Sequence, residues 1–579
     1  MTTKTGELFH FCVSSSAGPV RGSDADPIVT EIVRNSLNSI AAQIMRAFVR
    51  TAFTQVIYEM NDFAIALYDP QVRLLAQANS LPVFVGTLNF CVDAAVSAVG
   101  GPEALAPGDV VIYNMPYGTG SHAQDVAIVV PSFQGSQLVG YICSKAHWMD
   151  VGAKDPYCTD TTDVFQEGVV LPGIKLYSRG TLNADVFRII LANSRAPRAC
   201  EGDLKAQVTS AQLGARQLAR LMERYGSDTF RRAVERMFDH GEAQMRQFLE
   251  AIPDGRYVGT GRMDDNGLDN VPIAFEIDVE VRGSRVVIDF SRAPDAQLGP
   301  TNCPMPSTVS GSRVAITMLA ASNVQPNEGH FRPIEVVTRP GSMFHPLPPQ
   351  PCFLYGWPLM AAMEAINEAV SQAATGLAPA GGVADNVGLM VYGRGGDHDE
   401  LWTGGSVMPV GYGAHLGGDG ATLFVPALAF STMVPMEIDE TKSPLVYEAM
   451  EFVPDSCGAG RWRGGMGWRR QFRVVEDCQA ISTIEGTKAP PCGQRGGLSG
   501  APSRLIIVRP SGERRQSGKG TAIKLPKGTR VMIDAGGGGG YGKPLERDPV
   551  AVRRDMREGY ITEEYARTHY PQAFVPRES

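Results

Sequence analysis

The sequence predicts a sheet-rich α+β protein built in several layers. Short apolar runs separated by Pro, Gly, Asn and Asp occupy residues 62–178, which is typical of strands and hairpins. Long stretches with apolar residues at helical spacing lie before and after this region, and the chain becomes glycine-rich and strand-like beyond about residue 455. Because helices and strands are both abundant and partly segregated along the chain, we expect α+β architecture with helical insertions.

The elements suggest four regions in order. Residues 1–24 have the composition of a flexible tail, and residues 25–250 are expected to form an N-terminal α+β region that carries the candidate site. Residues 251–455 are expected to form a mixed α/β middle region, and residues 456–579 a glycine-rich β region. Because 579 residues exceed what one hydrophobic core usually serves, about three to four packed units are expected.

Two helical segments of the N-terminal region are the clearest local predictions. Asp26 is a plausible N-cap, Pro27 occupies the first helical position, and apolar residues recur at helical spacing as far as Phe48. The first of these is expected to bury one face. The second helical stretch consists of two runs, residues 202–226 and 229–252.

Composition excludes several classes of partner. Lys and Arg total 53 against 61 Asp and Glu, which gives a formal charge of −8, and no run of basic residues could follow a phosphate backbone or an anionic membrane. No stretch of about 18 apolar residues suggests a membrane span, and no signal-peptide core is evident, so we expect a soluble, cytoplasmic protein. The ten cysteines include no Cys-x-x-Cys pair, which argues against zinc knuckles and a disulfide framework.

Two histidines mark a candidate metal site. The runs "DVAIVVPSF" and "QLVGYICSKAH" flank the turn "QGS" at residues 134–136 and predict a hairpin. A hairpin centred near residue 135 would place His122 opposite His147 at its open end, with Cβ atoms about 5 Å apart. Isolated histidines at strand ends are commonly surface residues or satisfied hydrogen-bonding groups, so this alternative stays open.

Two carboxylates compete for the third ligand position. A second hairpin with a turn near residue 70 leaves Asp62 at its open end, although the sequence does not show whether the two open ends adjoin. Asp125 lies three residues after His122 and would point to the opposite face of a regular strand. Asp125 could become a ligand only if the glycine-rich segment that leads to His122 bends the chain and leaves His122 outside the strand. Two imidazoles and one carboxylate suit zinc, manganese or iron.

Several blocks of the chain are distinctive. They include "NMPYGTGSHAQDV", "SKAHWMDVG", "EGVVLPGIKL", "NSRAPRACEGDLKAQ", "PTNCPMPSTVSG" and "GAGRWRGGMGWRR". In these blocks the chain resembles the hydantoinase B/oxoprolinase family, which also includes a subunit of acetone and acetophenone carboxylases. The similarity extends from about residue 25 to 570.

The resemblance implies a metal-bearing subunit that works with a separate, ATP-using hydantoinase A-type subunit in a hetero-oligomer, with ATP and magnesium bound by that partner. The implied ligands are His122 and His147 with Asp62 or Asp125. The implied activity is hydrolysis of a cyclic amide, a hydantoin or lactam, after the partner phosphorylates its carbonyl oxygen. The alternatives are a ketone carboxylase subunit of the acetone or acetophenone type and a non-catalytic scaffold subunit.

Three acidic residues are candidates for acid–base chemistry beside the metal. Asp125 or Asp150 could act as a base or orient a ligand, although Asp150 is equally suited to a turn or cap. Glu59, which precedes "MND", is a further candidate acid. The sequence also departs from the family pattern around His122, where Met115 replaces an acid, and at Trp148, which replaces a second histidine. We therefore expect the substrate preference to differ from that of its relatives.

Overall fold

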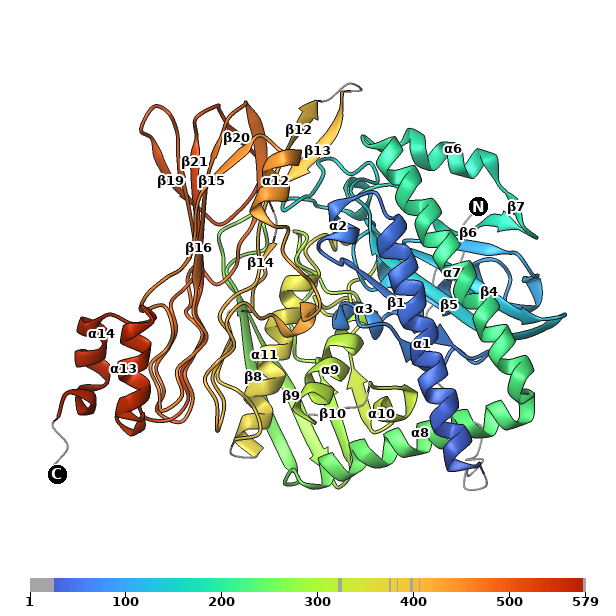
Figure 1. Ribbon diagram of the computed structural model, residues 1–579, viewed down its shortest axis with the longest axis horizontal. Coiled ribbons are helices and arrows are strands. Elements are labelled where there is room, and N and C mark those ends of the chain that lie inside the picture. Colours follow the sequence, from blue (N-terminus) through green and yellow to red (C-terminus); the bar gives the residue numbers. More distant parts are fainter. Residues whose placement is uncertain are drawn as a thin grey trace.

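The computed structural model describes residues 25–320, 325–373, 376–382, 384–395, 399–405 and 407–575 (Figure 1). The predicted tail at residues 1–24 lies outside the described residues. Four sheets and the helices packed on them form a mixed α+β structure, as the sequence predicts. Within the described residues, no helix is long and apolar enough to span a membrane.

The first sheet is antiparallel and seven-stranded, and it carries both candidate histidine segments. Its strands pair in the order β2-β1-β5-β4-β3-β6-β7, so β5 lies between β1 and β4. The central position of β5 brings together two hairpins that are far apart in the sequence. The strands are β1 (Phe63–Tyr68), β2 (Leu74–Gln77), β3 (Val110–Tyr113), β4 (Asp125–Gln134), β5 (Gln137–His147), β6 (Pro172–Ser178) and β7 (Thr181–Leu182).

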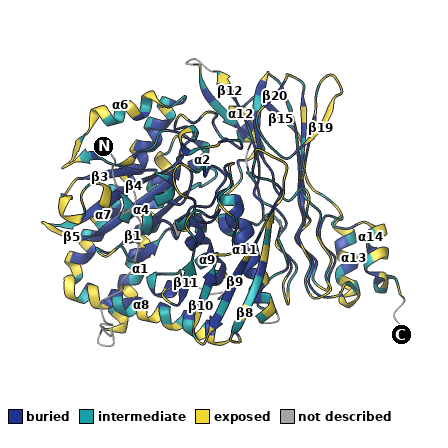
Figure 2. Ribbon diagram, turned by 180° about the vertical axis from the view of Figure 1, so that it is seen from behind, coloured by how far each residue is buried: buried dark blue, intermediate teal, exposed yellow. Residues whose placement is uncertain are grey.

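Both faces of this sheet are covered, which explains why its strands have nearly continuous apolar sequences. Helices α1 (Pro27–Thr51) and α7 (Pro197–Tyr225) cover one face, where side chains such as Ile65 and Ile128 are buried. Helix α4 (Leu88–Ala98) lies on the other face, and Ala64 and Val129 belong to the core there. Figure 2 shows the strands in dark blue, whereas outward faces of α6 and α8 are yellow.

The first long helix begins where the sequence predicts. The Asp26 side chain accepts a hydrogen bond from the backbone N–H of Ile28, and Pro27 is the first helical residue. The two predicted runs at residues 202–226 and 229–252 correspond to two helices, α7 and α8 (Ser227–Glu250), and Gly226 between them has a φ of 74°. Residues with side chains rarely adopt this conformation, so the glycine ends one helix and starts the next.

A second, four-stranded sheet supports the middle of the chain. Strands β8 to β10 are antiparallel, and β11 pairs in parallel with β10. Helices α9 (Met305–Leu319) and α11 (Gly356–Ala373) pack against this part of the molecule. Helix α11 is largely buried, because its N-terminal half also faces the candidate site. The strands are β8 (Gly255–Met263), β9 (Ile273–Arg282), β10 (Arg285–Asp289) and β11 (Ile334–Val337).

Two further sheets join the middle of the chain to its C-terminal part. Strands from both sides of the predicted boundary at residue 455 pair with one another, so both sheets cross that boundary. One sheet has the order β13-β12-β17-β20, with β14 also paired to β12, and contains β12 (Val387–Gly395), β13 (Glu400–Gly404), β14 (Val407–Met408), β17 (Cys478–Thr483) and β20 (Lys519–Leu525). The other has the order β15-β16-β21-β18-β19 and contains β15 (Leu445–Phe452), β16 (Trp468–Val474), β18 (Arg504–Val508), β19 (Arg514–Ser517) and β21 (Arg530–Ala535).

The run of five glycines at residues 536–540 is not a strand, although it lies in the region predicted to be glycine-rich β structure. It packs against other glycine-bearing segments through backbone hydrogen bonds, such as those between Gly538 N–H and the Gly465 carbonyl and between Gly539 N–H and the Gly381 carbonyl. A Cβ atom added to Gly538 would lie 2.0 Å from the carbonyl oxygen of Tyr412. The glycines therefore allow backbones to approach more closely than side chains permit.

The remaining helices are short, with four to nine residues each. Helices α13 and α14 form the end of the molecule farthest from the first sheet (Figure 1). These helices are α2 (Gln55–Tyr58), α3 (Pro82–Val85), α5 (Pro116–Thr119), α6 (Ala184–Ala192), α10 (Glu328–Phe331), α12 (Met436–Lys442), α13 (Pro549–Arg557) and α14 (Glu563–His569).

Candidate metal centre

Three side chains lie in a row across the end of the first sheet. Asp125, the first residue of β4, is directly opposite His147, the last residue of β5. On the other side of β5, the backbone N–H of His147 donates to the carbonyl oxygen of Asp62 at 3.0 Å. Directly opposed residues of antiparallel strands share a face, so both carboxylates flank the His147 imidazole. The pairing of β1 with β5 thus makes the two open hairpin ends adjoin.

The predicted pairing of His122 with His147 across the hairpin is wrong. The turn consists of two residues, because Gln134 pairs with Gln137, and a bulge between Ser132 and Phe133 shifts the register further. These two features together place Asp125, rather than His122, opposite His147.

His122 instead lies outside the strand, in the bend that would allow Asp125 to join the site. The short helix α5 ends at Gly120, which has a φ of 81°, and the N–H of Asp125 donates to the carbonyl of His122. This turn brings the His122 and His147 rings to a centroid distance of 5.0 Å. His122 therefore reaches the same site by a different local structure from the one predicted.

Three buried polar atoms at this site have no hydrogen-bond partner among the described residues: Nε2 of His122, Oδ1 of Asp125 and Nδ1 of His147. Nε2 and Oδ1 are 3.3 Å apart, and one ligand atom from each of the three residues lies within 4.8 Å of the others. Leaving such groups unpaired in a protein interior is costly, so their convergence needs an explanation. Two imidazoles and a carboxylate are a donor set that fits a divalent transition metal.

Two residues that the sequence analysis missed orient these groups. The carbonyl oxygen of Phe353 lies 2.9 Å from Nδ1 of His122, and the hydroxyl of Tyr355 donates to Oδ2 of Asp125 at 3.1 Å. Both precede helix α11, more than 200 residues after the ligands they contact. No spacing or motif in the sequence marked them, because only the tertiary fold brings this segment to the sheet.

A third missed residue, Lys145, supports the loop that leads to His122. Its ammonium group donates to Oγ1 of Thr87 at 2.8 Å, to the carbonyl of Thr119 at 3.1 Å and to Oγ of Ser121 at 3.2 Å. The side chain is fully buried, and burial lowers its pKa below the ordinary value for lysine. Lysine is rare in a buried, apolar strand such as β5, so its position in the sequence could have indicated a special role for Lys145.

The protonation of the site residues differs from that in water. Burial, reinforced by the charge of Asp125, raises the pKa of Asp62 to about 7. Burial and the nearby His122 lower the pKa of His147 to about 4, which favours the neutral imidazole that a metal requires. Burial opposes ionisation of Asp125, but the adjacent His122 outweighs it and holds the pKa of Asp125 below its ordinary value.

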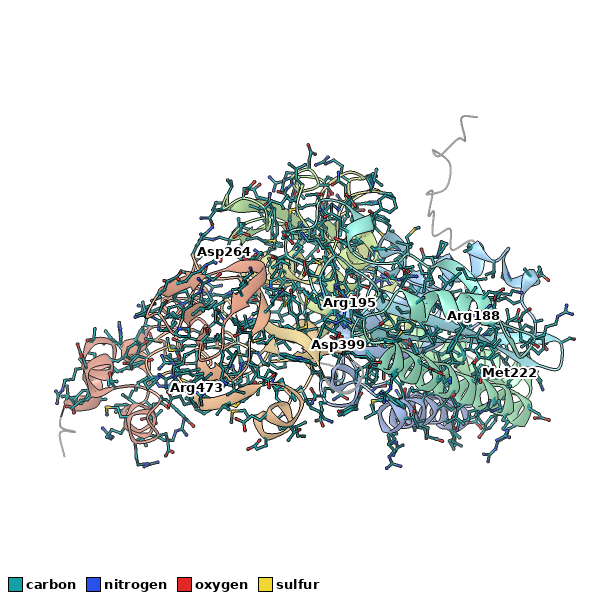
Figure 3. The ribbon with its side chains drawn as sticks, turned by 90° about the horizontal axis from the view of Figure 1, so that it is seen from above. Arg188, Arg195, Met222, Asp264, Asp399 and Arg473 are labelled. Atoms are coloured by element: carbon teal, nitrogen blue, oxygen red, sulfur yellow. The ribbon has the colours of Figure 1, made fainter. Side chains whose placement is uncertain are left out.

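The two other acidic candidates do not line this site. The buried Asp150 carboxylate accepts hydrogen bonds from Nη2 of Arg195 at 2.5 Å, from its Nε at 3.1 Å and from the backbone N–H of Gly152 at 3.1 Å. Arg195 is labelled in Figure 3. Glu59 is partly buried, and its backbone carbonyl accepts a hydrogen bond from the hydroxyl of Thr432. The structure therefore brings Asp62, Asp125 and both histidines together, whereas Asp150 forms an ion pair.

The four grouped residues form one wall of a cavity of about 170 Å³. Two tyrosines, Tyr157 and Tyr355, stand beside them. The opposite walls come from α11 and from the sheet containing β12, β14 and β17, and they are largely apolar. The cavity is thus lined by parts of all three predicted regions from residue 25 onward. Such a mostly apolar cavity with a few convergent polar groups is typical of a small-molecule site.

Comparison with known proteins identifies the family. The family model described as hydantoinase B/oxoprolinase matches residues 26–544. The chain belongs to this family. The resemblance seen in the sequence is therefore confirmed, and the candidate metal centre lies within the part of the chain that the hydantoinase B/oxoprolinase model covers.

Relatives cover nearly the whole chain. It is 28% identical over 573 residues to the B-type subunit of a putative D-/L-hydantoinase of Pseudomonas sp. (strain NS671), covering 94% of this chain and 95% of that protein. It is 29% identical over 561 residues to the beta-type subunit of the caprolactamase of Pseudomonas jessenii, covering 94% and 96% respectively. Both relatives of this hydantoinase B/oxoprolinase chain are named as subunits.

Two solved structures share the fold. The crystal structure of the ATP-dependent caprolactamase from Pseudomonas jessenii matches with a TM-score of 0.86 at 26% identity, covering 96% of this chain and 97% of that chain. Nucleotide-free acetone carboxylase matches with a TM-score of 0.85 at 19% identity, covering 94% and 79%. The predicted α+β class is confirmed. At 19% identity, the second likeness concerns the fold alone.

Proposed function

We propose that this chain is the metal-bearing catalytic subunit of an ATP-dependent cyclic amide hydrolase, acting on a hydantoin or lactam that a hydantoinase A-type partner has phosphorylated. The observation that carries the proposal is the convergence of three unsatisfied ligand atoms on the wall of a largely apolar cavity. The hydantoinase and caprolactamase subunits among its relatives support the choice of substrate class.

His122, Asp125 and His147 would hold a zinc, manganese or iron ion. When bound, such an ion supplies a Lewis acid and lowers the pKa of a coordinated water. The chain prepares the ligands for this role. Because the Phe353 carbonyl accepts the Nδ1 proton of His122, Nε2 of that ring is left as the lone-pair atom. The Tyr355 hydroxyl in turn holds Oδ2 of Asp125 and leaves Oδ1 facing the two histidines.

Asp62 is the remaining carboxylate in the cavity wall, and we assign it the role of base. It flanks His147 on the side opposite Asp125 and is not one of the three grouped ligands. Its carboxylate would accept a proton from the attacking water and return it to the leaving nitrogen when the ring opens. A cyclic amide resists attack because of resonance, so phosphorylation of its oxygen by the partner, with ATP and magnesium, would make the carbonyl carbon more reactive toward water. Expulsion of the protonated nitrogen would then open the ring and leave an acyl phosphate, and a second water would hydrolyse this to the carboxylate and free phosphate.

The test is co-purification with the ATP-using partner, followed by metal analysis and ATP-turnover assays over hydantoins, lactams and ketones. We expect one metal ion per chain and cyclic amide hydrolysis that needs no bicarbonate. His122→Ala and His147→Ala should each remove the metal and the activity. His240→Ala, which changes an exposed histidine on α8, is the matched control and should alter neither. A purified active complex without stoichiometric metal would contradict the proposal.

The same assay separates the two alternatives. A ketone carboxylase subunit would require bicarbonate for product formation. We retain this alternative because the chain shares its fold with acetone carboxylase. A non-catalytic scaffold predicts that both histidine variants leave metal content and activity of the complex unchanged.

A further inference from the structure

A buried glutamate outside the cavity holds the turn that contacts two of the candidate ligands. Oε1 of Glu167 accepts hydrogen bonds from the backbone N–H groups of Cys352 and Phe353, both at 2.8 Å. It also accepts one from the hydroxyl of Thr161 at 2.9 Å. Glu167 is fully buried and is not among the residues that line the cavity, so it acts on the site only through this turn.

The turn at residues 352–355 supplies both contacts that orient the ligands. It closes through a hydrogen bond of 3.0 Å from the N–H of its last residue to the carbonyl of its first. The Phe353 carbonyl lies 2.9 Å from Nδ1 of His122. The Tyr355 hydroxyl donates to Oδ2 of Asp125 at 3.1 Å. Because one short turn carries both groups, a shift of its backbone would displace two ligands together.

Three successive peptide units of this turn are held from outside it. The N–H of Leu354 donates to the carbonyl of Pro300 at 2.9 Å and fixes the plane that contains the Phe353 carbonyl. The two preceding N–H groups donate to Glu167. Without this carboxylate, both of these buried N–H groups would lose that acceptor, which is costly enough to move the backbone.

Glu167 itself belongs to a segment that is anchored to the first sheet. The side-chain amide of Asn114, which follows β3, donates to the carbonyl of Val169 at 2.9 Å and to that of Ala123 at 2.8 Å. Ala123 is the neighbour of His122, so this amide connects the segment of Glu167 with the ligand loop. Glu167 therefore joins the turn before α11 to the part of the sheet that carries the ligands.

We propose that Glu167 is a positioning residue of the metal centre, which fixes the turn at residues 352–355 and thereby orients His122 and Asp125. The inference rests on the proposed function, because it takes these two residues and His147 as metal ligands. Residues that orient ligands in this way typically contribute 10- to 100-fold to metal affinity.

The position of Oε1, rather than negative charge, is what the turn requires. The three hydrogen bonds go to Oε1, whereas the buried Oε2 has no hydrogen-bond partner among the described residues. Burial raises the pKa of Glu167 to about 7, so its neutral form is well populated at neutral pH. Glutamine would present an oxygen in the same place. Aspartate is shorter by one C–C bond of about 1.5 Å, which puts the two N–H groups beyond hydrogen-bond reach.

The experiment compares Glu167→Asp with Glu167→Gln in the full-length chain, using competition with a chromophoric chelator for Zn²⁺. We expect Glu167→Asp to bind Zn²⁺ about 10- to 100-fold more weakly and Glu167→Gln to remain within about twofold of the unmodified chain. Unchanged affinity in a folded Glu167→Asp chain would overturn the inference. Equal losses in both variants would also overturn it, because charge rather than position would then be responsible.

Asp264→Glu is the matched control. This buried carboxylate also accepts hydrogen bonds from a backbone N–H and a threonine hydroxyl, both of Thr487, at 2.8 and 2.7 Å, but it does not line the cavity. Changing its length by one methylene should leave Zn²⁺ affinity unchanged. A loss equal to that of Glu167→Asp would show that disturbance of any buried carboxylate is sufficient, which would contradict the proposal.

A spectroscopic measurement separates positioning from a general loss of stability. In the metal-free chain, labelled with ¹⁵N-histidine and kept at alkaline pH, the Phe353 carbonyl should hold the proton of neutral His122 on Nδ1. We expect this single tautomer in the unmodified chain and in Glu167→Gln, and a mixture of tautomers in Glu167→Asp. A pure Nδ1–H tautomer in a folded Glu167→Asp chain would refute the positioning role.

A second variant keeps the proposal testable if Glu167→Asp does not fold. Thr161→Val removes one hydrogen bond to Oε1 and keeps the side-chain shape, so Zn²⁺ affinity should fall at least threefold; unchanged affinity would overturn the inference. These results do not depend on turnover. If the complex hydrolyses no cyclic amide but the expected order of affinities holds, the proposed function fails and the inference stands. If hydrolysis occurs and that order fails, the inference alone is wrong.

Discussion

Replacing Tyr355 by Phe tests whether the metal site depends on the hydrogen bond to Asp125. The substitution keeps the ring and removes only the hydroxyl, which donates to Oδ2 of Asp125 at 3.1 Å. A hydrogen bond to a charged group contributes about 1.5–3 kcal/mol, and this one is longer than the 2.5–2.7 Å typical of O–H donors to carboxylates. We therefore take the lower end, about 1.5 kcal/mol, which corresponds to about tenfold weaker metal binding.

The assay is competition between the purified chain and a chromophoric chelator for Zn²⁺ and for Mn²⁺ at fixed pH. Tyr157→Phe is the matched control, because this second tyrosine of the cavity also contacts the His122 and His147 rings and is not a hydrogen-bond donor to Asp125 in the described structure. Metal affinity within twofold of the unmodified chain for a folded Tyr355→Phe variant would refute the reasoning. An equal loss of metal affinity in Tyr157→Phe would also refute the reasoning, because a general disturbance of the cavity would then explain the effect of both substitutions.

Three further predictions concern stability. Gly538→Ala should prevent folding or lower the free energy of unfolding by at least about 3 kcal/mol, because the added Cβ would lie 2.0 Å from a carbonyl oxygen. Gly518→Ala is the control, since an added Cβ there meets no atom within 4 Å, and denaturant titrations should show no loss of stability. Burial raises the pKa of Asp93 from 3.8 to about 6, so its ionisation destabilises the folded chain as the pH rises from about 4 to 6. The free energy of unfolding of Asp93→Asn should equal that of the unmodified chain near pH 4 and exceed it by up to about 3 kcal/mol at pH 8, as measured by thermal unfolding. Asp150→Asn should cost about 2–4 kcal/mol by leaving Arg195 unpaired, yet keep one metal ion per chain; loss of the metal would indicate a direct role at the site.

The sequence by itself determined the local elements and the residue types of the site. Helix α1 begins at the predicted cap because Asp26 and Pro27 act on the nearest backbone groups, which need no distant partner. Likewise, alternating turns and apolar runs were enough to indicate the hairpin that ends at His147. The two histidines and two carboxylates were identifiable because their chemistry is unusual beside apolar runs.

Only the tertiary structure decided how these residues meet. The two-residue turn and a bulge between Ser132 and Phe133 together placed Asp125 opposite His147. The pairing of β1 with β5 placed Asp62 at the site, although their sequences are compatible with many neighbours. Tyr355 and the cavity walls formed by α11 and by β12, β14 and β17 come from segments more than 200 residues after the ligands, and their position depends on how whole sheets and helices pack, which no local pattern encodes.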